Sequence, residues 1–298
     1  MTHTKQVKDL FGPDVEKYFV NKQIGGNSNQ KGSRYEDFFS VMQLAQLFQL
    51  LTNDDDKDDI EIYAQAEAFV DDLLIKFKKH NIQHHFQLKN TPTVNWGKGL
   101  KSISDDFYKQ KVLNDNLGID ITRTVLVCSD KEKAARLQKN IPTNIADFAD
   151  IIFFPEVDTI NHLILIDDQF KMLIGQICFS NDIDKLEALA KLILGHWVDK
   201  KTTLSSVNKL LSTLENAFPN YLARLNVTEN LLPEVERIFS TITHFSFKIE
   251  KGYFSWQYHD FDSGTIPYSV DSKEFIAFQQ EITSKCPKQF DELEGTLL

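Results

Sequence analysis

The chain has 298 residues, of which 42% are hydrophobic and 26% are charged, and its formal net charge is −10. This balance predicts a globular protein with one large or two ordinary domains, and the acidic charge counts against a simple DNA-binding domain, which is typically basic. The sequence has no run of about 18 apolar residues, no signal-peptide pattern and no CxxC pair, so we expect a cytoplasmic protein with reduced thiols, no membrane association and no zinc ribbon.

Residues 1–30 are predicted to form an N-terminal appendage with one short helix at 8–21 and a glycine-rich loop at 25–32. The loop lacks the GxxxxGK[ST] pattern and a preceding strand, which favours a plain loop over a phosphate cradle. Ser33 and Glu36 have the spacing of a capping box at the start of a helix that continues to Leu51. An aspartate-rich loop follows, without the glycine and glutamate of a calcium-binding EF-hand.

A β-hairpin is predicted next, with 60–77 as one long strand, 78–81 as the turn and 85–88 as the returning strand. The pattern then predicts a helix at 100–113, a strand at 123–128, a helix at 131–139 and a strand at 151–154. Helices and strands in this order indicate an α/β fold with a mixed sheet.

Helical periodicity dominates after residue 182. Helices are predicted at 184–198, 204–218, 231–243 and 273–284, and a β-rich patch at 245–258. We therefore expect a division near residue 180, between an α/β domain at 31–180 and a mostly helical domain at 181–298 with a partner-binding or regulatory role.

Four side chains in the first domain have the chemistry that phosphodiester hydrolysis requires. The reaction needs a hard cation held by oxygen ligands, an oriented water and stabilisation of the developing negative charge. Asp72 and the side-chain carbonyl of Gln87 are predicted to bind Mg²⁺, with the Leu88 carbonyl as a further ligand. Glu36 would act through a metal-bound water. Lys89, on the same strand face as Gln87, would orient the attacking water.

The segments GSRYEDFF, EAFVDDLLI and FQLKN resemble the PD-(D/E)xK nuclease superfamily. Its usual signature is an acidic residue on the first helix, an acidic residue in a strand and a QxK pair. The resemblance covers about residues 32–130 and is greatest to the nuclease domains of bacterial anti-phage effectors and restriction-type enzymes. It implies a restriction-endonuclease-like fold and cleavage of double-stranded DNA with Mg²⁺ or Mn²⁺, often under the control of a second domain or a partner.

Two departures and several plainer interpretations accompany this resemblance. Gln87 replaces the acidic residue of the commoner signature, and the adjacent Asp71 competes with Asp72 for the metal-ligand role. We prefer Asp72 because it directly precedes an apolar run, and we give Asp71 a supporting role. Glu36 alone as a capping residue, the aspartates as a solvated strand end, and Lys89 as an exposed lysine are the structural alternatives.

Lys98 and Lys101 follow the QxK strand and are candidates for phosphate contacts, with a solvated helix face as the alternative. The sequence thus predicts a metal-dependent DNA endonuclease, an effector of anti-phage defence that acts as a homo-oligomer or with a protein partner such as a helicase or sensor. The alternatives are a non-catalytic scaffold or recognition subunit, and a C-terminal half that recognises a small effector or a partner protein. Because of its acidic charge, the isolated monomer is expected to bind duplex DNA weakly.

Overall fold

The structure is a computed structural model. It describes the following residues: 3–28, 34–53, 59–91, 93–201, 203–224, 227, 231–259 and 261–297. The predicted helix cap Ser33 and most of the aspartate-rich loop lie outside these ranges. Within them, no helix combines the length and apolar character that crossing a membrane requires.

Two compact units make up the chain. The first contains Met1–Lys171 and Ala190–Thr213, and the second contains Met172–Leu189 and Leu214–Leu298. Each unit is thus assembled from two separate segments, whereas the sequence predicted a single division near residue 180.

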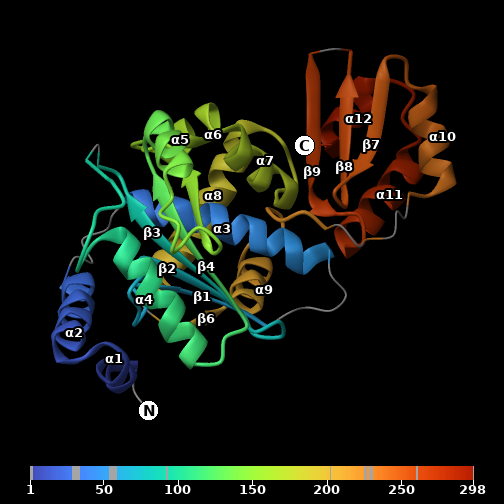
Figure 1. Ribbon diagram of the computed structural model, residues 1–298. Coiled ribbons are helices and arrows are strands. Elements are labelled where there is room, and N and C mark those ends of the chain that lie inside the picture. Colours follow the sequence, from blue (N-terminus) through green and yellow to red (C-terminus); the bar gives the residue numbers. More distant parts are fainter. Residues whose placement is uncertain are drawn as a thin grey trace. The chain divides into compact units, whose positions relative to one another are not determined.

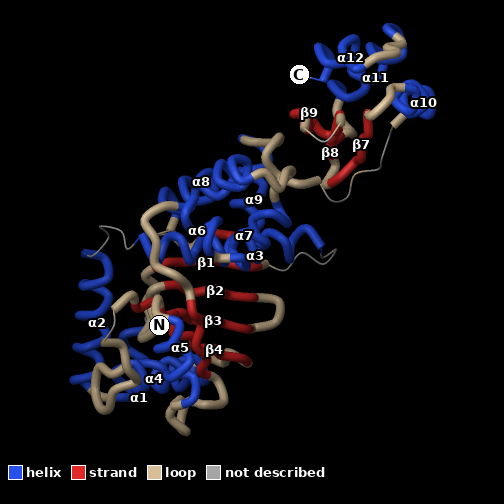
Figure 2. Tube along the Cα trace, turned by 90° about the horizontal axis from the view of Figure 1, so that it is seen from above, coloured by secondary structure: helices blue, strands red, loops and turns tan. Residues whose placement is uncertain are grey.

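A six-stranded mixed sheet forms the centre of the first unit, with the strand order β5-β4-β3-β2-β1-β6. Its strands are β1 (Ile60–Ala64), β2 (Leu73–Phe77), β3 (Ile82–Lys89), β4 (Ile121–Cys128), β5 (Ala149–Phe153) and β6 (Ser205–Ser206). Strand β4 is parallel to β3 and to β5, and the remaining neighbours are antiparallel. Figure 2 shows β1 to β4 side by side in this order. The predicted α/β class with a mixed sheet flanked by helices is confirmed.

Helices cover both faces of this sheet. They are α1 (His3–Phe11), α2 (Pro13–Ser28), α3 (Arg34–Asn53), α4 (Ile103–Asn116), α5 (Lys131–Lys139) and α6 (Ile160–Ile166). Phe39 of α3 packs against Phe86, with 5.4 Å between the ring centroids, whereas Asn114 of α4 contacts the adjacent His85. Consecutive strand residues point to opposite faces, so α3 and α4 lie on opposite sides of the strands (Figure 1).

The segment 190–213 belongs to the first unit through specific contacts. Helices α7 (Asp168–Ile177), α8 (Ile183–Lys200) and α9 (Val207–Ala217) each run from one unit into the other. The buried Asp37 of α3 accepts hydrogen bonds from Trp197 Nε1 at 3.2 Å and from Lys201 Nζ at 2.8 Å. Strand β6 pairs with β1 through Ser206 and Glu61. The segment 190–213 therefore supplies the hydrogen-bond donors for Asp37 of α3 and the strand that pairs with the edge of β1.

The predicted single strand at 60–77 is wrong, because β1 ends at Ala64 and β2 begins at Leu73 as its antiparallel partner. Gln65 has a φ of 53°, which turns the chain out of the extended conformation. Beyond it, the backbone N–H groups of Phe69 and Val70 donate to the Gln110 side chain of α4, at 2.8 and 3.3 Å. The Gln110 side chain thus accepts hydrogen bonds that a neighbouring strand would accept in a continuous sheet.

The N-terminal helices also differ from the prediction. Gly12, at a φ of 86°, separates α1 from α2, and Pro13 takes the first helical position, where its missing N–H costs nothing. Residues 25–28, predicted as loop, belong to α2. The buried side chains of Val7 and Phe19 form a small cluster with Phe69 and Leu113, so the predicted appendage packs into the first unit.

The second unit contains a three-stranded antiparallel sheet, β7 (Phe245–Glu250), β8 (Tyr253–Tyr258) and β9 (Asp262–Ser269). Helices α10 (Pro233–Thr241), α11 (Lys273–Lys285) and α12 (Phe290–Leu297) pack on one face of it. The fully buried Phe239 lies at the centre of this core, with four phenylalanine rings within 6.5 Å of its centroid: Phe245, Phe247, Phe254 and Phe278. Aromatic burial of this kind supplies much of the stability of a small core.

Candidate active site

The predicted catalytic residues converge where β2 and β3 meet. Asp72 directly precedes β2, whose Leu73 pairs with Phe86, so Asp72 lies opposite Gln87 across the hairpin. Its carboxylate accepts hydrogen bonds from the Leu88 N–H at 2.7 Å and from the Gln87 side-chain amide. Asp72 therefore contacts the QxK strand directly.

Glu36, in the first turn of α3, belongs to the same group. Gln65 donates a hydrogen bond of 3.4 Å to its carboxylate. The pKa of Glu36 is raised to about 7, chiefly by burial. The negative charges of Asp72 and Asp37 also raise this pKa, and the positive charges of Lys89 and Lys201 lower it by less. A carboxylate that is buried beside a second carboxylate is suited to share a divalent cation with it, since the cation would relieve their repulsion.

The pKa of Glu36 predicts a pH-dependent stability. The pKa of Glu36 is higher in the folded protein than in the unfolded chain, so the folded protein holds a proton on this carboxyl group over a pH range in which the unfolded chain has lost it. The free energy of unfolding therefore falls as pH rises from about 4.5 to about 7. Glu36→Gln removes this loss. We expect the variant to gain roughly 1–3 kcal/mol over the wild type between pH 4.5 and 8, measured by urea unfolding across that range.

The control for this experiment is Glu132→Gln, which removes an exposed first-turn glutamate from α5. Its stability difference from the wild type should stay constant over the same pH range. A Glu36→Gln difference that also stayed constant would contradict the buried, charge-crowded position of Glu36.

A buried polar network holds the segment before Asp72. His85, 1% exposed, contacts the Val70 carbonyl at 3.2 Å and the Asn114 amide at 3.1 Å. Burial lowers the pKa of His85 to about 3, which keeps the ring neutral near pH 7. The ring thus has a structural role. In the described part of the chain, no group of three or more His, Cys, Asp or Glu residues is placed to hold a metal ion.

Asp71 faces Lys22, a residue that no sequence motif marks. Its carboxylate is 3.3 Å from the ammonium of Lys22, on α2. The same ammonium is 3.1 Å from the carboxylate of Asp106. Tyr18 donates a hydrogen bond of 2.9 Å to the same Asp106. Burial raises the pKa of Asp71 to about 6, although the Lys22 charge lowers it. Asp71 therefore takes part in a buried charge cluster, whereas Asp72 contacts the QxK strand.

Gln87 connects the two groups. Its amide nitrogen donates to Asp72, and its carbonyl oxygen accepts a hydrogen bond of 3.3 Å from Lys22. The carbonyl that was predicted to bind metal is thus bonded to a lysine in this structure. Nothing local in the sequence marks Lys22, since a lysine on a helix is ordinarily solvated.

A lysine-lined hollow of about 350 Å³ adjoins the site. Lys89 lines it together with Lys98 and Lys101, the two predicted phosphate contacts, and with Ser102 at the start of α4. Gly97 and Lys101, with φ values of 67° and 72°, curve the intervening loop towards the helix N-terminus. Ammonium groups and a helix N-terminus both favour bound anions, so the hollow suits a phosphate group.

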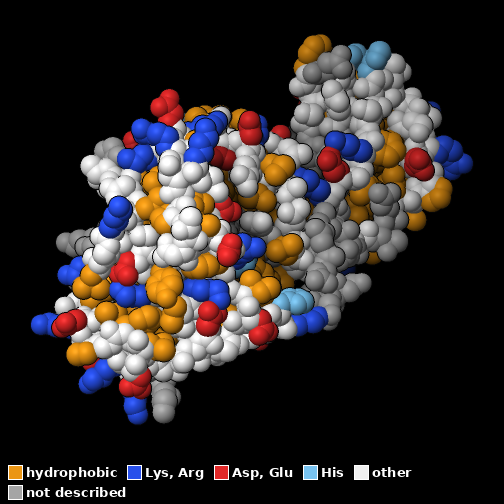
Figure 3. All heavy atoms as spheres, in the orientation of Figure 1, with side chains coloured by type: hydrophobic (Ala, Val, Ile, Leu, Met, Phe, Trp, Pro, Cys, Tyr) orange, Lys and Arg blue, Asp and Glu red, His pale blue; other side chains and the backbone are white. Residues whose placement is uncertain are grey.

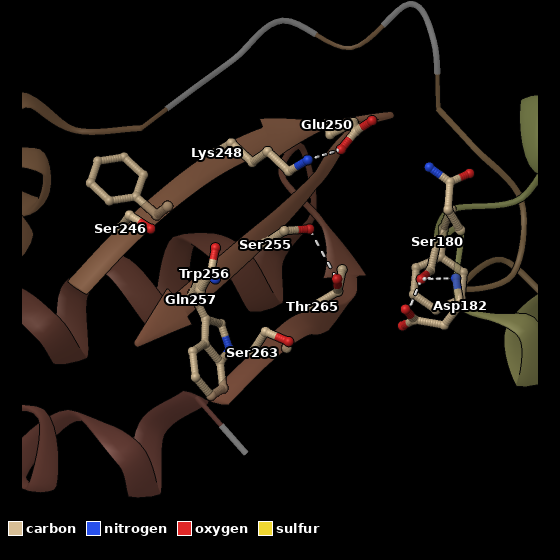
Figure 4. Close-up of a pocket in the computed structure, with 14 residues that line it drawn as sticks. Ser180, Asp182, Ser246, Lys248, Glu250, Ser255, Trp256, Gln257, Ser263 and Thr265 are labelled. Carbon is tan, nitrogen blue, oxygen red and sulfur yellow. Dashed lines mark hydrogen bonds and ion pairs between the residues drawn. The ribbon is translucent and has the colours of Figure 1, made fainter. Parts of the chain in front are cut away.

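The second unit has a hollow of its own, of about 340 Å³, between residues 179–182 and the sheet (Figure 4). Hydroxyl and amide side chains from all three strands line it. Ser255 and Thr265 are hydrogen-bonded at 2.9 Å, and the ammonium of Lys248 pairs with Glu250 at 2.5 Å. Its charged side chains are paired within the hollow, since Lys248 pairs with Glu250 and the Asp182 carboxylate accepts a hydrogen bond of 2.9 Å from Ser180.

Comparison of the chain with protein-family models, with curated proteins and with solved structures found no match.

Proposed function

We propose that the first unit is a metal-dependent endodeoxyribonuclease of the PD-(D/E)xK type with a restriction-endonuclease-like fold. The observation that carries this proposal is the contact of Asp72 with the Gln87–Lys89 strand, next to Glu36 and beside the lysine-lined hollow. One helix and a β-hairpin thus bring together carboxylates, an amide and cations in the order that the sequence signature implies.

The oxygen donors fit a hard divalent cation. Mg²⁺ is typically bound through one or two carboxylates plus waters, and the carboxylates of Asp72 and Glu36 meet that need. When bound, the ion would polarise the phosphodiester and lower the pKa of a water. Lys89 would hold that water and offset the charge that develops on the phosphate oxygens. The loop at 97–101 and the first turn of α4 would hold a neighbouring phosphate.

The direct test uses purified protein and supercoiled plasmid DNA with Mg²⁺ or Mn²⁺. We expect nicked and linear products that EDTA abolishes. A plasmid that stays supercoiled at high protein concentration would contradict the catalytic proposal. It would favour the second candidate, a non-catalytic recognition subunit, which the bond between Lys22 and the Gln87 carbonyl supports.

The charge of the molecule bears on how it reaches its substrate. The net charge is −10, and on the face shown in Figure 3 basic side chains are interspersed with acidic ones. Cation–phosphate contacts supply most non-specific affinity for DNA, so the chain alone should bind duplex weakly at physiological salt. We propose that it acts in anti-phage defence as a homo-oligomer or with a DNA-binding partner, such as a helicase or sensor, that concentrates it on double-stranded DNA.

The lysine-lined hollow gives a quantitative prediction for that binding. Lys98→Ala and Lys101→Ala should each weaken duplex affinity and reduce the slope of log K against log salt concentration by about 1, because each removes one phosphate contact. Fluorescence anisotropy with a labelled duplex at several low salt concentrations measures both quantities. Lys139→Ala, an exposed lysine of α5, is the control and should change neither. An unchanged slope in both Lys98→Ala and Lys101→Ala would mean that the phosphates of the duplex bind outside this hollow.

A further inference from the structure

The ammonium of Lys22 lies among oxygen atoms in the manner of a bound cation. Four oxygens surround Nζ: a carboxylate oxygen of Asp71 at 3.3 Å, one of Asp106 at 3.1 Å, the Gln87 carbonyl at 3.3 Å and the Phe69 backbone carbonyl. Asp71 and Gln87 are 5% and 4% exposed and the Lys22 side chain is 17% exposed, so this group is largely shielded from solvent. The buried Asp71 oxygen that faces Lys22 has no hydrogen bond, which leaves the ion pair as its compensation.

We infer that α2 is an autoinhibitory element whose Lys22 keeps the proposed metal site in its metal-free state. This inference rests on the proposed function, because it requires that a metal bind at Asp72 and Gln87. The competition concerns one atom, the side-chain carbonyl oxygen of Gln87. In the structure that oxygen accepts from Lys22 while the amide nitrogen donates to Asp72.

Metal binding reverses the preferred direction of this amide. A cation on Asp72 attracts the carbonyl of Gln87, and an amide that turns its oxygen to the cation turns its N–H₂ group to the Lys22 ammonium. Two donors then face each other in a closed space, which leaves the ammonium with one bond fewer and is unfavourable for a buried charge. Docking of Lys22 and ligation of a metal by Gln87 therefore oppose each other.

The anchoring of the N-terminal helices suits a reversible element. Among the described side chains of α1 and α2, only Val7 and Phe19 are buried, in the small cluster with Phe69 and Leu113. The polar contacts of α2 with the site run through Tyr18 and Lys22. Release of α2 would break this small cluster and the bonds of Tyr18 and Lys22, and it would leave the strand pairing of the sheet unchanged. By linkage, metal binding must loosen α2 to the same extent that α2 weakens metal binding.

The test measures Mn²⁺ binding by calorimetry, without DNA, in four proteins: the wild type, Lys22→Met, Lys98→Met and Asp72→Asn. We expect Lys22→Met to bind Mn²⁺ about 5-fold or more tightly than the wild type. Lys98→Met removes an exposed cation that lines the neighbouring hollow, so its smaller gain gives the general electrostatic effect. When Gln87 is replaced by leucine, adding Lys22→Met should increase Mn²⁺ affinity only by this general electrostatic effect, because the competition for the Gln87 carbonyl is then absent.

A second measurement uses only the wild type and so does not depend on how a variant folds. Mn²⁺ should accelerate amide hydrogen exchange in α2 while leaving α4 unchanged. Asp72-dependent Mn²⁺ binding with neither a Lys22→Met gain nor faster exchange in α2 would overturn this inference and leave the proposed function standing. No Mn²⁺ binding by any of the proteins would overturn both.

Discussion

Asp72→Asn is expected to reduce Mn²⁺-dependent plasmid cleavage by about 10²-fold or more. The substitution removes the negative charge that would bind the metal, yet the asparagine side-chain oxygen can still accept from the Leu88 N–H, which bonds Asp72 at 2.7 Å. The loss should therefore come with little change in thermal unfolding. Initial rates of nicking and a melting curve on the same preparation measure the two effects.

A matched control for Asp72→Asn is available at the opposite end of β3, where Asp120 lies beside Asn81. Asp120 also directly precedes a strand, β4, but its side chain is exposed. Asp120→Asn should cleave like the wild type. Full cleavage by Asp72→Asn would remove Asp72 from the site, and an inactive Asp71→Asn beside it would transfer the metal-ligand role to Asp71.

Phe239→Ala is expected to destabilise the second unit by about 3–5 kcal/mol, which is the usual cost of removing a buried phenylalanine ring. The ring is 0% exposed and touches four other phenylalanine rings, so the neighbours cannot close the cavity without giving up their own contacts. Urea unfolding followed by far-UV circular dichroism and tryptophan fluorescence measures the change.

Phe261→Ala is the control, because the same side chain in the same unit is 87% exposed there. It should change the free energy of unfolding by less than about 0.5 kcal/mol. Equal effects of the two substitutions would mean that the aromatic cluster does not stabilise this unit.

Elements with strong periodicity or clear turn residues could be predicted from the sequence. The helices at 131–139 and 273–284 and the hairpin around residues 78–81 lie where the pattern placed them. The segment 60–77 was misassigned because its apolar residues suit a strand, whereas a side chain of a distant helix, Gln110, takes the hydrogen bonds of residues 69 and 70. Tertiary contacts of this kind leave no local trace in a sequence.

Other elements were missed for local reasons. Helices α6 and α7 were not assigned, because each is short and the two are separated at Asp167, whose backbone is extended (φ −114°, ψ 99°). Strand β9 contains Gly264 and Pro267, residues that are depleted in strands. Gly264 is needed there because a Cβ atom would lie 2.9 Å from the Trp256 ring.

The candidate site was predictable in part. Asp72, Gln87, Lys89 and Glu36 were selected by residue type and order, and the structure brings them together. Lys22 could not be found in this way, because its importance comes from four oxygens that are distant in sequence, on Phe69, Asp71, Gln87 and Asp106. A segment predicted as an appendage thus supplies a cation that contacts Gln87, one of the proposed ligands.

The two-segment composition of the first unit has a consequence for its synthesis. Asp37 leaves the ribosome long before Trp197 and Lys201, its partners in the folded protein, and β1 precedes its edge partner β6 by a similar interval. Translation proceeds at about 5–20 residues per second, so the nascent α3 carries an unpaired carboxylate for several seconds. The first unit therefore cannot finish folding in the usual N-terminal-first order. It closes only after a segment of the second unit, 172–189, has already emerged.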